Sequence, residues 1–541
     1  MDTFAEKHGA DKPDDWREAI ALPDLRDIGA KVVKIAGRQI ALFYRGDTVY
    51  ACNNHCPHEG YPLKEGTLTG DCVLTCNWHN WKFDLRTGDN LNYGDSVRVY
   101  PTDVRDGKVW IDVADAPAAE RRAAALEALQ GAFDEDEFYR YDRMAREIAR
   151  FEKAGGDPLD AVRAAIRWTH DRLPDGMTHA HAAGADWLRL RADRAEKPGE
   201  NLMPVLEMIA HLNWDTLKEE PHPYPEGARD WDADAFVAAV DAEDEAAAVG
   251  YVRGALDAGL GWADLEAAMA RAALAHYQDF GHSVIYVIKT GELLERLGDE
   301  VLEPLVLALT RSLVVAWRED LIPEFRDYHD ILTDWQAGDG DAPASKDLAG
   351  LKPDKLMTRI AASRAAPVAA YNALYGLSAS HLLGFDTRWQ DAVDNAVRHN
   401  TTWLSITHEL TFANACRQLA ERYPALWPQV LLQMACFAGR NAPYVDDDPA
   451  PGDWHVADND AAAFFDREAR ALFDHGQSEY IVTAHQIKTL TAIEDEVTNA
   501  PDAPWRNTAM AGLNRFLHTP LKRRHSLRTA NQAIDFVANE D

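Results

Sequence analysis

The organisation of this 541-residue chain is decided by Cys56-Pro-His58 and, after seventeen intervening residues, by Cys76-Asn-Trp-His79. The two motifs together supply two thiolates and two imidazoles. This ligand set holds a [2Fe-2S] cluster when two histidines replace two cysteines on one of the irons. Two cysteines and two histidines also suit a tetrahedral zinc site, which is the alternative interpretation. The residues that flank both motifs favour the iron-sulfur cluster.

These flanking residues resemble the Rieske family over residues 15–115. The first motif continues as CPHEGYPLKEGTL (56–68) and the second as HNWKFDLRTGD (79–89). Both stretches look like the cluster-binding loops of Rieske ferredoxins and of the Rieske domains of ring-hydroxylating oxygenases. The resemblance implies a Rieske-type [2Fe-2S] cluster and also which iron each ligand holds. Cys56 and Cys76 would bind the inner iron, and His58 and His79 the outer, solvent-facing iron.

Two residues of the second loop depart from the family pattern, because Asn77 and Asn80 stand where proline and glycine are usual. Asparagine tolerates a left-handed backbone better than most residues, so Asn80 is expected to keep the tight turn that glycine would give. The Rieske subtype of respiratory complexes carries a disulfide between its loops, but the corresponding positions here hold Tyr61 and Trp78. The resemblance is therefore to the ferredoxin-like subtype.

Composition limits the partners and the location of the chain. With 89 acidic and 56 basic residues the net charge is −33, which disfavours a nucleic acid or an anionic membrane as partner. Residues 1–16 lack an apolar signal core, and no run of 18 apolar residues occurs, so we expect a cytoplasmic protein that does not enter a membrane. In a reducing compartment the cysteines outside the two motifs are expected to be buried thiols and not disulfides. They are Cys52, Cys72, Cys416 and Cys436.

Short β-rich runs occupy the first 115 residues. They are Lys31–Ile35, Gln39–Tyr44, Thr48–Cys52 and Lys108–Val113. The sequence Arg45-Gly46-Asp47 between the second and third runs predicts a hairpin. An Ala/Asp/Pro stretch at 114–119 then separates this β-rich region from an alanine-rich region with almost no strand pattern. We predict a domain boundary there.

From about Glu120 onward, apolar residues recur at spacings of three and four, which predicts amphipathic helices. Examples are Leu202–Ile209, Leu265–Leu274, Val301–Leu313 and Leu426–Cys436. Polar breaks at 219–234, 337–350 and 441–458 cut the region into four segments. The predicted fold class is α+β multidomain, with an N-terminal all-β Rieske domain (1–115) followed by a large all-α domain (116–541). The all-α domain is expected to contain about four degenerate helical repeats, at about 120–225, 226–340, 341–445 and 446–541.

Each predicted repeat carries a pair of histidines, the first near the end of one helix and the second near the start of the next. The pairs are His170 with His179 or His181, His276 with His282, His399 with His408, and His475 with His485. A single histidine on a helix is more often a core or surface residue. In repeats that close into a ring, however, equivalent positions converge, as bundle helices converge on a metal site. His179, His282, His408 and His485 are therefore the predicted ligands of a mononuclear iron. The alternates are His170, His181, His276, His399 and His475.

Geometry limits which neighbouring residues can join such a site. His179 and His181 lie two residues apart, so only one of them should point inward. Lys289 lies seven residues after His282, and Lys488 lies three after His485, which are same-face spacings on a helix. A charged lysine is repelled by a metal ion, so a solvated or ion-paired lysine is the plainer interpretation. A place in the metal site requires a neutral amine, or a carbamylated one that offers an oxygen ligand.

The helical, histidine-bearing region also resembles the questin oxidase-like family, which are helical oxygenases of polyketide ring cleavage. The resemblance lies in the repeated helix openings at His179, His282, His408 and His485, together with Lys289 or Lys488. For that family, a non-heme iron held by histidines and a modified lysine has been proposed. The resemblance implies an oxygenase, and the chain departs from the family by carrying a Rieske domain.

Three functional hypotheses follow. The first is an oxygenase in which the cluster passes electrons to a His-ligated non-heme iron that uses O₂ on a small organic substrate, with Glu207 or Glu409 orienting the ligands. The second is an electron-transfer or redox-sensing protein whose helical domain binds a partner and no metal. The third is a cofactor-free oxidase with a histidine base. Because GxGxxG and P-loop motifs do not occur, electrons are expected from an external NAD(P)H-dependent reductase or ferredoxin reductase. The sequence is also compatible with a homo-oligomer.

Overall fold

The structure is a computed structural model in which the described residues are 15–92, 94–134, 140–336, 338–446, 454–456 and 461–539. The chain divides into two compact units, Met1–Pro158 and Leu159–Asp541. The change from strand to helix falls within the stretch expected from the sequence, whereas the division between the units lies at residue 158. The domain and repeat limits given above remain predictions. Among the described residues, no helix is long and apolar enough to cross a membrane.

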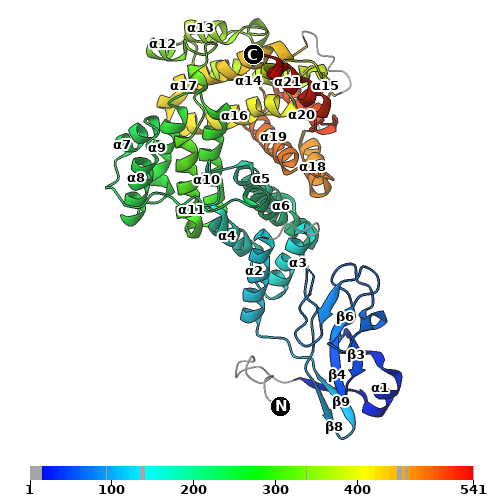
Figure 1. Cartoon of the computed structure of the whole chain (residues 1–541). Coiled ribbons are helices and arrows are strands. Elements are labelled where there is room, and N and C mark those ends of the chain that lie inside the picture. The colour runs from blue at the N-terminus through cyan, green and yellow to red at the C-terminus, as the bar shows by residue number, and fades with distance from the viewer. Residues whose placement is uncertain are drawn as a thin grey trace. The chain divides into compact units, whose positions relative to one another are not determined.

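Three small antiparallel sheets form the β part of the first unit (Figure 1), with strand orders β1-β9-β8, β2-β3-β4 and β5-β6-β7. The strands are β1 (Trp16–Ala21), β2 (Ala30–Ile35), β3 (Arg38–Arg45), β4 (Thr48–Asn53), β5 (Thr67–Leu68), β6 (Val73–Thr75), β7 (Lys82–Asp84), β8 (Thr102–Arg105) and β9 (Lys108–Asp112), with α1 (Leu22–Ile28) after β1. The four predicted strands are confirmed as β2, β3, β4 and β9. The predicted hairpin joins β3 to β4, and Gly46 and Asp47 at its tip have φ of 57° and 58°, as a tight hairpin turn requires.

Strand β3 separates two apolar cores because its side chains alternate between its faces. Ala41 and Phe43 pack into the core that contains both motif cysteines. Ile40 and Leu42 point the other way, into a second core with residues of β4 and β9. The middle of β3 is therefore buried on both faces, which fixes its register and positions the loop that follows β4.

Helices make up the rest of the described chain, which confirms the predicted fold class. They are α2 (Ala118–Asp134), α3 (Arg140–Lys153), α4 (Pro158–Thr169), α5 (His179–Arg194), α6 (Pro198–Thr216), α7 (Ala233–Asp241), α8 (Glu245–Asp257), α9 (Trp262–Leu274), α10 (His282–Leu297), α11 (Leu302–Val314), α12 (Tyr328–Thr333), α13 (Pro353–Ser363), α14 (Pro367–Gly384), α15 (Arg388–Asp391), α16 (Trp403–Arg422), α17 (Trp427–Asn441), α18 (Ala461–Ala471), α19 (Tyr480–Asn499), α20 (Arg506–His518) and α21 (Ser526–Ala538). The four helices predicted from apolar spacing correspond to α6, α9, α11 and α17.

Four helices form a closed ring at the centre of the helical unit (Figure 1). Helix α5 contacts α10, α10 contacts α16, α16 contacts α19, and α19 returns to α5. Each also packs against an outer helix, namely α6, α11, α17 and α20 respectively. Thr178 caps α5 by accepting from the amide of Ala180, and Thr402 caps α16 by accepting from that of Leu404. One helix from each predicted repeat thus contributes to the ring.

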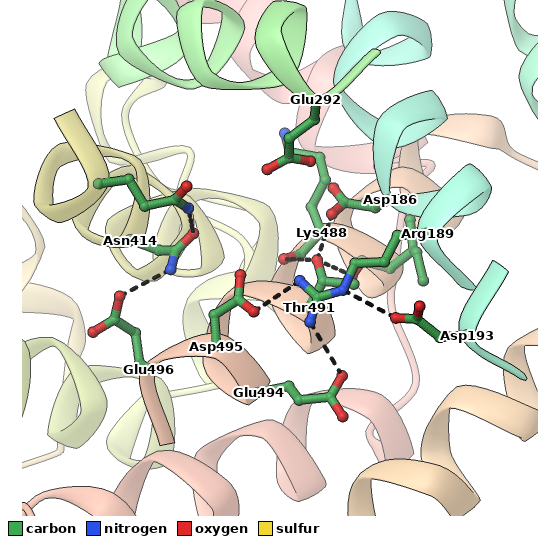
Figure 2. Close-up of polar contacts among 12 residues, drawn as sticks. Asp186, Arg189, Asp193, Glu292, Asn414, Lys488, Thr491, Glu494, Asp495 and Glu496 are labelled. Atoms are coloured by element: carbon green, nitrogen blue, oxygen red, sulfur yellow. Dashed lines mark hydrogen bonds and ion pairs between the residues drawn. The ribbon is translucent and has the colours of Figure 1, made fainter. Parts of the chain in front are cut away.

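Polar contacts join the helices of this ring (Figure 2). Arg189 of α5 lies 2.8 Å from Asp495 and 3.9 Å from Glu494, both on α19. Glu496, also on α19, accepts hydrogen bonds from Asn414 and Arg417 of α16, each at 2.8 Å. Because the Glu496 side chain is buried, these two donors from α16 replace the hydrogen bonds that water would otherwise make to its carboxylate.

Replacing Glu496 by alanine is expected to lower the free energy of unfolding of the helical unit by about 3 kcal/mol, because it leaves the Arg417 charge without its buried partner. The measurement is denaturant unfolding of the full chain followed by circular dichroism. The matched control is Glu421→Ala, which removes an exposed carboxylate 2.7 Å from the same arginine and should cost less than about 1 kcal/mol. If both variants lose the same free energy of unfolding, the buried contact of Arg417 with Glu496 stabilises the unit no more than the exposed contact with Glu421.

Candidate metal centres

The two loops that carry the predicted cluster ligands have the same backbone turn. The amide of Gly60 donates to the carbonyl of Cys56 at 2.8 Å, and the amide of Asn80 donates to the carbonyl of Cys76 at 2.9 Å. Gly60 has a φ of 75° and Asn80 a φ of 63°. The expectation that Asn80 adopts the left-handed conformation of the usual glycine is therefore confirmed.

Replacing Asn80 by valine is expected to destabilise the second loop by roughly 1–2 kcal/mol, because a β-branched residue is strained at positive φ. The control is Asn80→Gly, which should be as stable as the parent because glycine adopts this conformation without steric cost. The measurement is the temperature at which the visible absorbance of the cluster bleaches. If the valine and glycine variants bleach at the same temperature, the turn does not depend on the left-handed residue.

Side chains hold the two loops against each other. The Asn77 amide donates to the carbonyl of Glu65 at 2.9 Å, and its oxygen accepts from the hydroxyl of Thr67 at 3.0 Å. Tyr61 and Trp78, which occupy the positions of the respiratory-type disulfide, meet edge to face with ring centroids 5.4 Å apart. An aromatic contact thus joins the loops at these positions.

The four predicted ligands have the environments that a [2Fe-2S] cluster needs. The cysteines are buried, with Cys56 at 3% and Cys76 at 1% exposure, while the rings of His58 and His79 lie 4.5 Å apart and His79 reaches the surface. Trp81 stacks on His58 at 4.7 Å. Burial raises the pKa of the Cys56 thiol to about 11, so a bound metal ion is what would stabilise its thiolate. Two buried sulfur donors and two imidazoles therefore fit the group.

Comparisons with known proteins agree with this geometry. A family model described as the Rieske [2Fe-2S] domain matches residues 15–101. Over 100 residues the chain is 30% identical to the ferredoxin component of the naphthalene 1,2-dioxygenase system of Pseudomonas putida, a match that covers 18% of this chain and 95% of that relative. The chain belongs to the Rieske family.

Two further matches fall in the same Rieske domain. Over 79 residues the chain is 37% identical to the ferredoxin subunit of the 3-phenylpropionate/cinnamic acid dioxygenase of Escherichia coli (strain K12), covering 14% of this chain and 74% of that subunit. A solved structure, the ferredoxin of carbazole 1,9a-dioxygenase from Nocardioides aromaticivorans IC177, matches at 25% identity over 18% of this chain and 96% of that one, with a TM-score of 0.17. The helical unit that follows the Rieske domain has no family assignment.

The predicted iron ligands of the helical unit meet at the centre of its ring. Nε2 of His282 lies 3.2 Å from Nε2 of His179 and 2.8 Å from Nε2 of His408. The ring of His485 lies beside them, with its centroid 4.9 Å from that of His179 and 4.6 Å from that of His408. These residues come from α5, α10, α16 and α19, and we refer to the four together as the histidine cluster.

Hydrogen bonds to the backbone fix how three of these rings are protonated. In each of the three, Nδ1 faces a backbone carbonyl oxygen. The distances are 2.6 Å from His282 to Asp279, 2.7 Å from His408 to Leu404 and 2.6 Å from His485 to Ile481. A carbonyl oxygen only accepts, so Nδ1 carries the hydrogen and Nε2 keeps its lone pair. The lone pairs of His282 and His408 then face each other at 2.8 Å, which is repulsive unless a cation lies beside them.

The Nε2 atoms of His179, His282 and His408 lie at distances from one another that suit a metal ion. Nitrogen ligands with bonds of about 2.1 Å lie about 3 Å apart when they occupy adjacent positions around one ion. Burial lowers the pKa of all four cluster histidines, and the nearby charge of Lys488 lowers each of them further; for His282 the value falls to about 3. The rings are therefore neutral at neutral pH, which is the form that binds metals.

A turn of rare geometry positions His282, and sequence reasoning missed it. Asp279, Phe280 and Gly281 have successive φ values of 51°, 53° and 78°. The left-handed region costs the two residues that are not glycine of order 1–3 kcal/mol each, which the surrounding contacts must offset. The amide of Phe280 donates to the Glu319 carboxylate at 3.0 Å. At Gly281, a Cβ would lie 2.5 Å from the ring of Phe412. The glycine just before the helix that opens with His282 was the available signal in the sequence.

The two lysines near the predicted site have different surroundings. Nζ of Lys289 lies 2.8 Å from Asp186 and 3.0 Å from Glu292, so this lysine is ion-paired. Nζ of Lys488 is buried and has no hydrogen-bond partner within the described part of the chain. Burial lowers the pKa of Lys488 to about 7, so a substantial fraction of this amine is neutral at neutral pH. Of the two, Lys488 is the one that adjoins the histidine cluster.

The alternate histidines make contacts outside the cluster. His170 faces the Arg167 carbonyl at 3.1 Å, His181 accepts from the Thr178 amide at 3.2 Å, His276 meets Asp320 at 2.9 Å, His399 meets the Tyr444 hydroxyl at 3.0 Å, and His475 lies 3.5 Å from Glu207. Of the pair His179 and His181, only the first faces the cluster, as expected. Glu409 bonds to His381 at 3.1 Å and to Asn441 at 2.8 Å. The two glutamates expected to orient ligands thus contact other histidines.

Proposed function

We propose that the protein is an oxygenase in which the Rieske cluster supplies electrons to a non-heme iron held by His179, His282 and His408. The observation that carries the proposal is the convergence of the Nε2 atoms of His179, His282 and His408 in a ring of helices, where those of His282 and His408 bear lone pairs and no hydrogens. Imidazole ligands suit zinc, copper, iron and nickel. Zinc has no redox chemistry, so an electron-carrying domain on the same chain favours iron. The resemblance of the helical region to questin oxidase-like oxygenases supports the same choice.

The residues around the cluster divide into those that hold the ion and those that face a substrate. Backbone carbonyls orient the His282 and His408 rings, so that their lone pairs point to a common position. When bound there, iron would supply the activation of O₂. His179 and His282 are only partly buried, which leaves this side of the site accessible. Tyr286 lies 5.7 Å from His282, and Phe280 lies 6.2 Å from His408, between ring centroids. These aromatic rings suit a small organic substrate.

The electrons would come from an external NAD(P)H-dependent reductase or ferredoxin reductase. Three of the relatives named above are ferredoxins of dioxygenase systems, and a ferredoxin passes on electrons that it receives from another protein. A Rieske cluster has a potential roughly between −150 and +300 mV, which suits delivery to a metal centre that reacts with O₂. The strongly acidic surface implied by the charge of −33 favours a reductase with a basic docking face.

The test is the amount of iron and acid-labile sulfide per chain in anaerobically purified protein, with electron paramagnetic resonance before and after reduction. The cluster accounts for about two irons and two sulfides. A third iron with its own mononuclear signal, and O₂ uptake that depends on substrate and reductase, are the results expected. Two irons and no other metal in cluster-replete protein would overturn the proposal. That result would favour the electron-transfer hypothesis, in which the helical unit binds a partner.

Replacing Lys488 by methionine is expected to leave the third iron in place and to stabilise the helical unit by about 1–3 kcal/mol, because it removes a buried polar group without a partner. We further propose that this amine, which adjoins the histidine cluster, donates to a substrate oxygen, so substrate-dependent O₂ uptake should nevertheless fall at least tenfold. The control is Lys289→Met, which breaks two ion pairs and should instead destabilise the unit. Unchanged turnover in the Lys488 variant would assign this lysine a structural role only.

A further inference from the structure

A second group of metal-binding side chains lies in the helical unit, outside the histidine cluster. His276 follows α9, Asp320 lies in the short 3-10 helix η4 (Glu319–Leu321), and His329 lies in α12. Nδ1 of His276 is 2.9 Å from Oδ2 of Asp320, and Nε2 of His329 is 2.6 Å from the same oxygen. The two nitrogens are 3.4 Å apart. Two parts of the chain that lie 44 residues apart thus bring two imidazoles and one carboxylate together.

We propose that His276, Asp320 and His329 bind one divalent transition-metal ion of the zinc type. Ligands at about 2.0–2.1 Å from a tetrahedral ion lie about 3.3–3.4 Å apart, and the two nitrogens already have this spacing. The Asp320 oxygen, 2.9 and 2.6 Å from these nitrogens, would have to lie about 0.4–0.8 Å farther from them to match. Three protein ligands leave the fourth position open to water, on the side where the His329 side chain is 46% exposed. This inference does not depend on the proposed function.

The surroundings of these ligands also fit a metal ion. Nε2 of His276 lies 2.5 Å from a carboxylate oxygen of Asp241, the last residue of α7. A metal-bound histidine usually donates its second ring hydrogen to a carboxylate in this way, which leaves the Nδ1 lone pair for the ion. Asp320 is buried, and Arg318 donates to both of its carboxylate oxygens at 3.0 Å, which stabilises the charged form of the ligand. Two carboxylates against one guanidinium leave a net negative charge that attracts a cation.

Position in the fold indicates what such an ion would do. The amide of Asp320 donates to the carbonyl of Tyr277 at 2.9 Å, and the amide of Asp279 donates to the carbonyl of Trp317 at 2.8 Å. These bonds pair the segment after His276 with the segment before Asp320. The first segment continues directly into the left-handed turn that places His282. An ion bound by both segments would therefore hold that turn in place.

The experiment uses the full chain with its Rieske cluster in a His408→Ala background, which removes one ligand of the histidine cluster, so that Zn²⁺ binding lost on His329→Ala is assigned to the second site. The protein is freed of loosely bound metal with a chelator, its labile sulfide is checked, and it is titrated with Zn²⁺ by calorimetry. Co²⁺ provides a second readout, because its visible bands report tetrahedral nitrogen and oxygen ligands. His329→Ala and Asp241→Asn are the test variants. His170→Ala is the control, because that histidine is also partly exposed, but its ring faces a backbone carbonyl and stacks on Tyr224 instead of meeting a carboxylate.

The expected result is one Zn²⁺ per chain in the His408→Ala protein and in the His170 control. His329→Ala should weaken binding at least 100-fold and abolish the tetrahedral Co²⁺ spectrum. Asp241→Asn should weaken it roughly 10–100-fold, as removal of an orienting carboxylate does. All variants should unfold at the same denaturant concentration in chelator, which shows that they fold. Equal Zn²⁺ affinity in the His329 variant and its control, or no stoichiometric binding at all, would mean that these residues form a hydrogen-bonded ion cluster only.

Discussion

Replacing His408 by alanine is expected to remove the third iron and, with it, substrate-dependent O₂ uptake, while the Rieske cluster stays intact. His408 contributes one of the two Nε2 atoms that approach most closely, 2.8 Å from that of His282, and it lies beside the His485 ring. Without it, the remaining rings would offer one nitrogen ligand fewer, which weakens the binding of the ion. Iron per chain should fall from about three to about two, and sulfide should remain at about two.

The matched control for this variant is His399→Ala. His399 belongs to the same predicted pair as His408, but its ring contacts the hydroxyl of Tyr444 and lies outside the histidine cluster. The control should keep the third iron and the O₂ uptake. Loss of iron from both variants would indicate a general effect on folding, and retention of iron in both would contradict the assigned ligands. Electron paramagnetic resonance of the reduced cluster, recorded in parallel, reports whether the first unit is undisturbed.

Most of the helices and strands could be predicted from the sequence, because the patterns that specify them are local. The β-rich run Gln39–Tyr44 and the Gly46-Asp47 turn predict a hairpin from local sequence alone, and β3 and β4 form it. The spacing of apolar residues in 265–274 likewise predicts α9. The division between the two compact units at residue 158 could not be predicted from the sequence, because it depends on how α2 and α3 pack and not on their own sequence.

The histidine cluster was foreseeable only through its repetition. One histidine near the start of each ring helix suggested convergence, and His179, His282, His408 and His485 do lie together. Which of the two lysines is ion-paired and which adjoins the histidine cluster was not predicted, although the sequence contained a signal. Lys289 and Lys488 both stand within Ile-Lys-Thr, but three residues later one has a glutamate and the other a threonine. That glutamate, Glu292, supplies one of the carboxylates that pair with Lys289.

Contacts between segments that lie far apart in the chain could not be predicted from the sequence. Glu319 lies 39 residues after Phe280, and no periodicity links the two. The same holds for His329 and His276, which are 53 residues apart and belong to no repeated motif. Such pairs depend on tertiary packing, and a single sequence carries no local pattern that reports them.

Replacing Cys76 by alanine is expected to abolish the cluster and leave the histidine cluster loaded. Cys76 is 1% exposed, and a buried site without this thiolate cannot complete the ligand set of a Rieske cluster. Sulfide per chain should fall from about two to near zero and iron from about three to about one, with loss of the Rieske spectrum and of reductase-dependent turnover. The measurement is iron, sulfide and visible absorbance on the same preparation.

The control for that variant is Cys72→Ser, which tests whether removal of a neighbouring thiol also disturbs the cluster. Cys72 is one of the six free cysteines, and its sulfur lies 2.8 Å from the hydroxyl of Tyr50, so it is already engaged away from the cluster. The serine variant should therefore keep two sulfides per chain. A Cys76 variant that still carries sulfide would show that the cluster has recruited another ligand. If the Cys76 variant instead loses all of its iron, the third iron depends on the Rieske domain, and the helical histidines do not hold it by themselves.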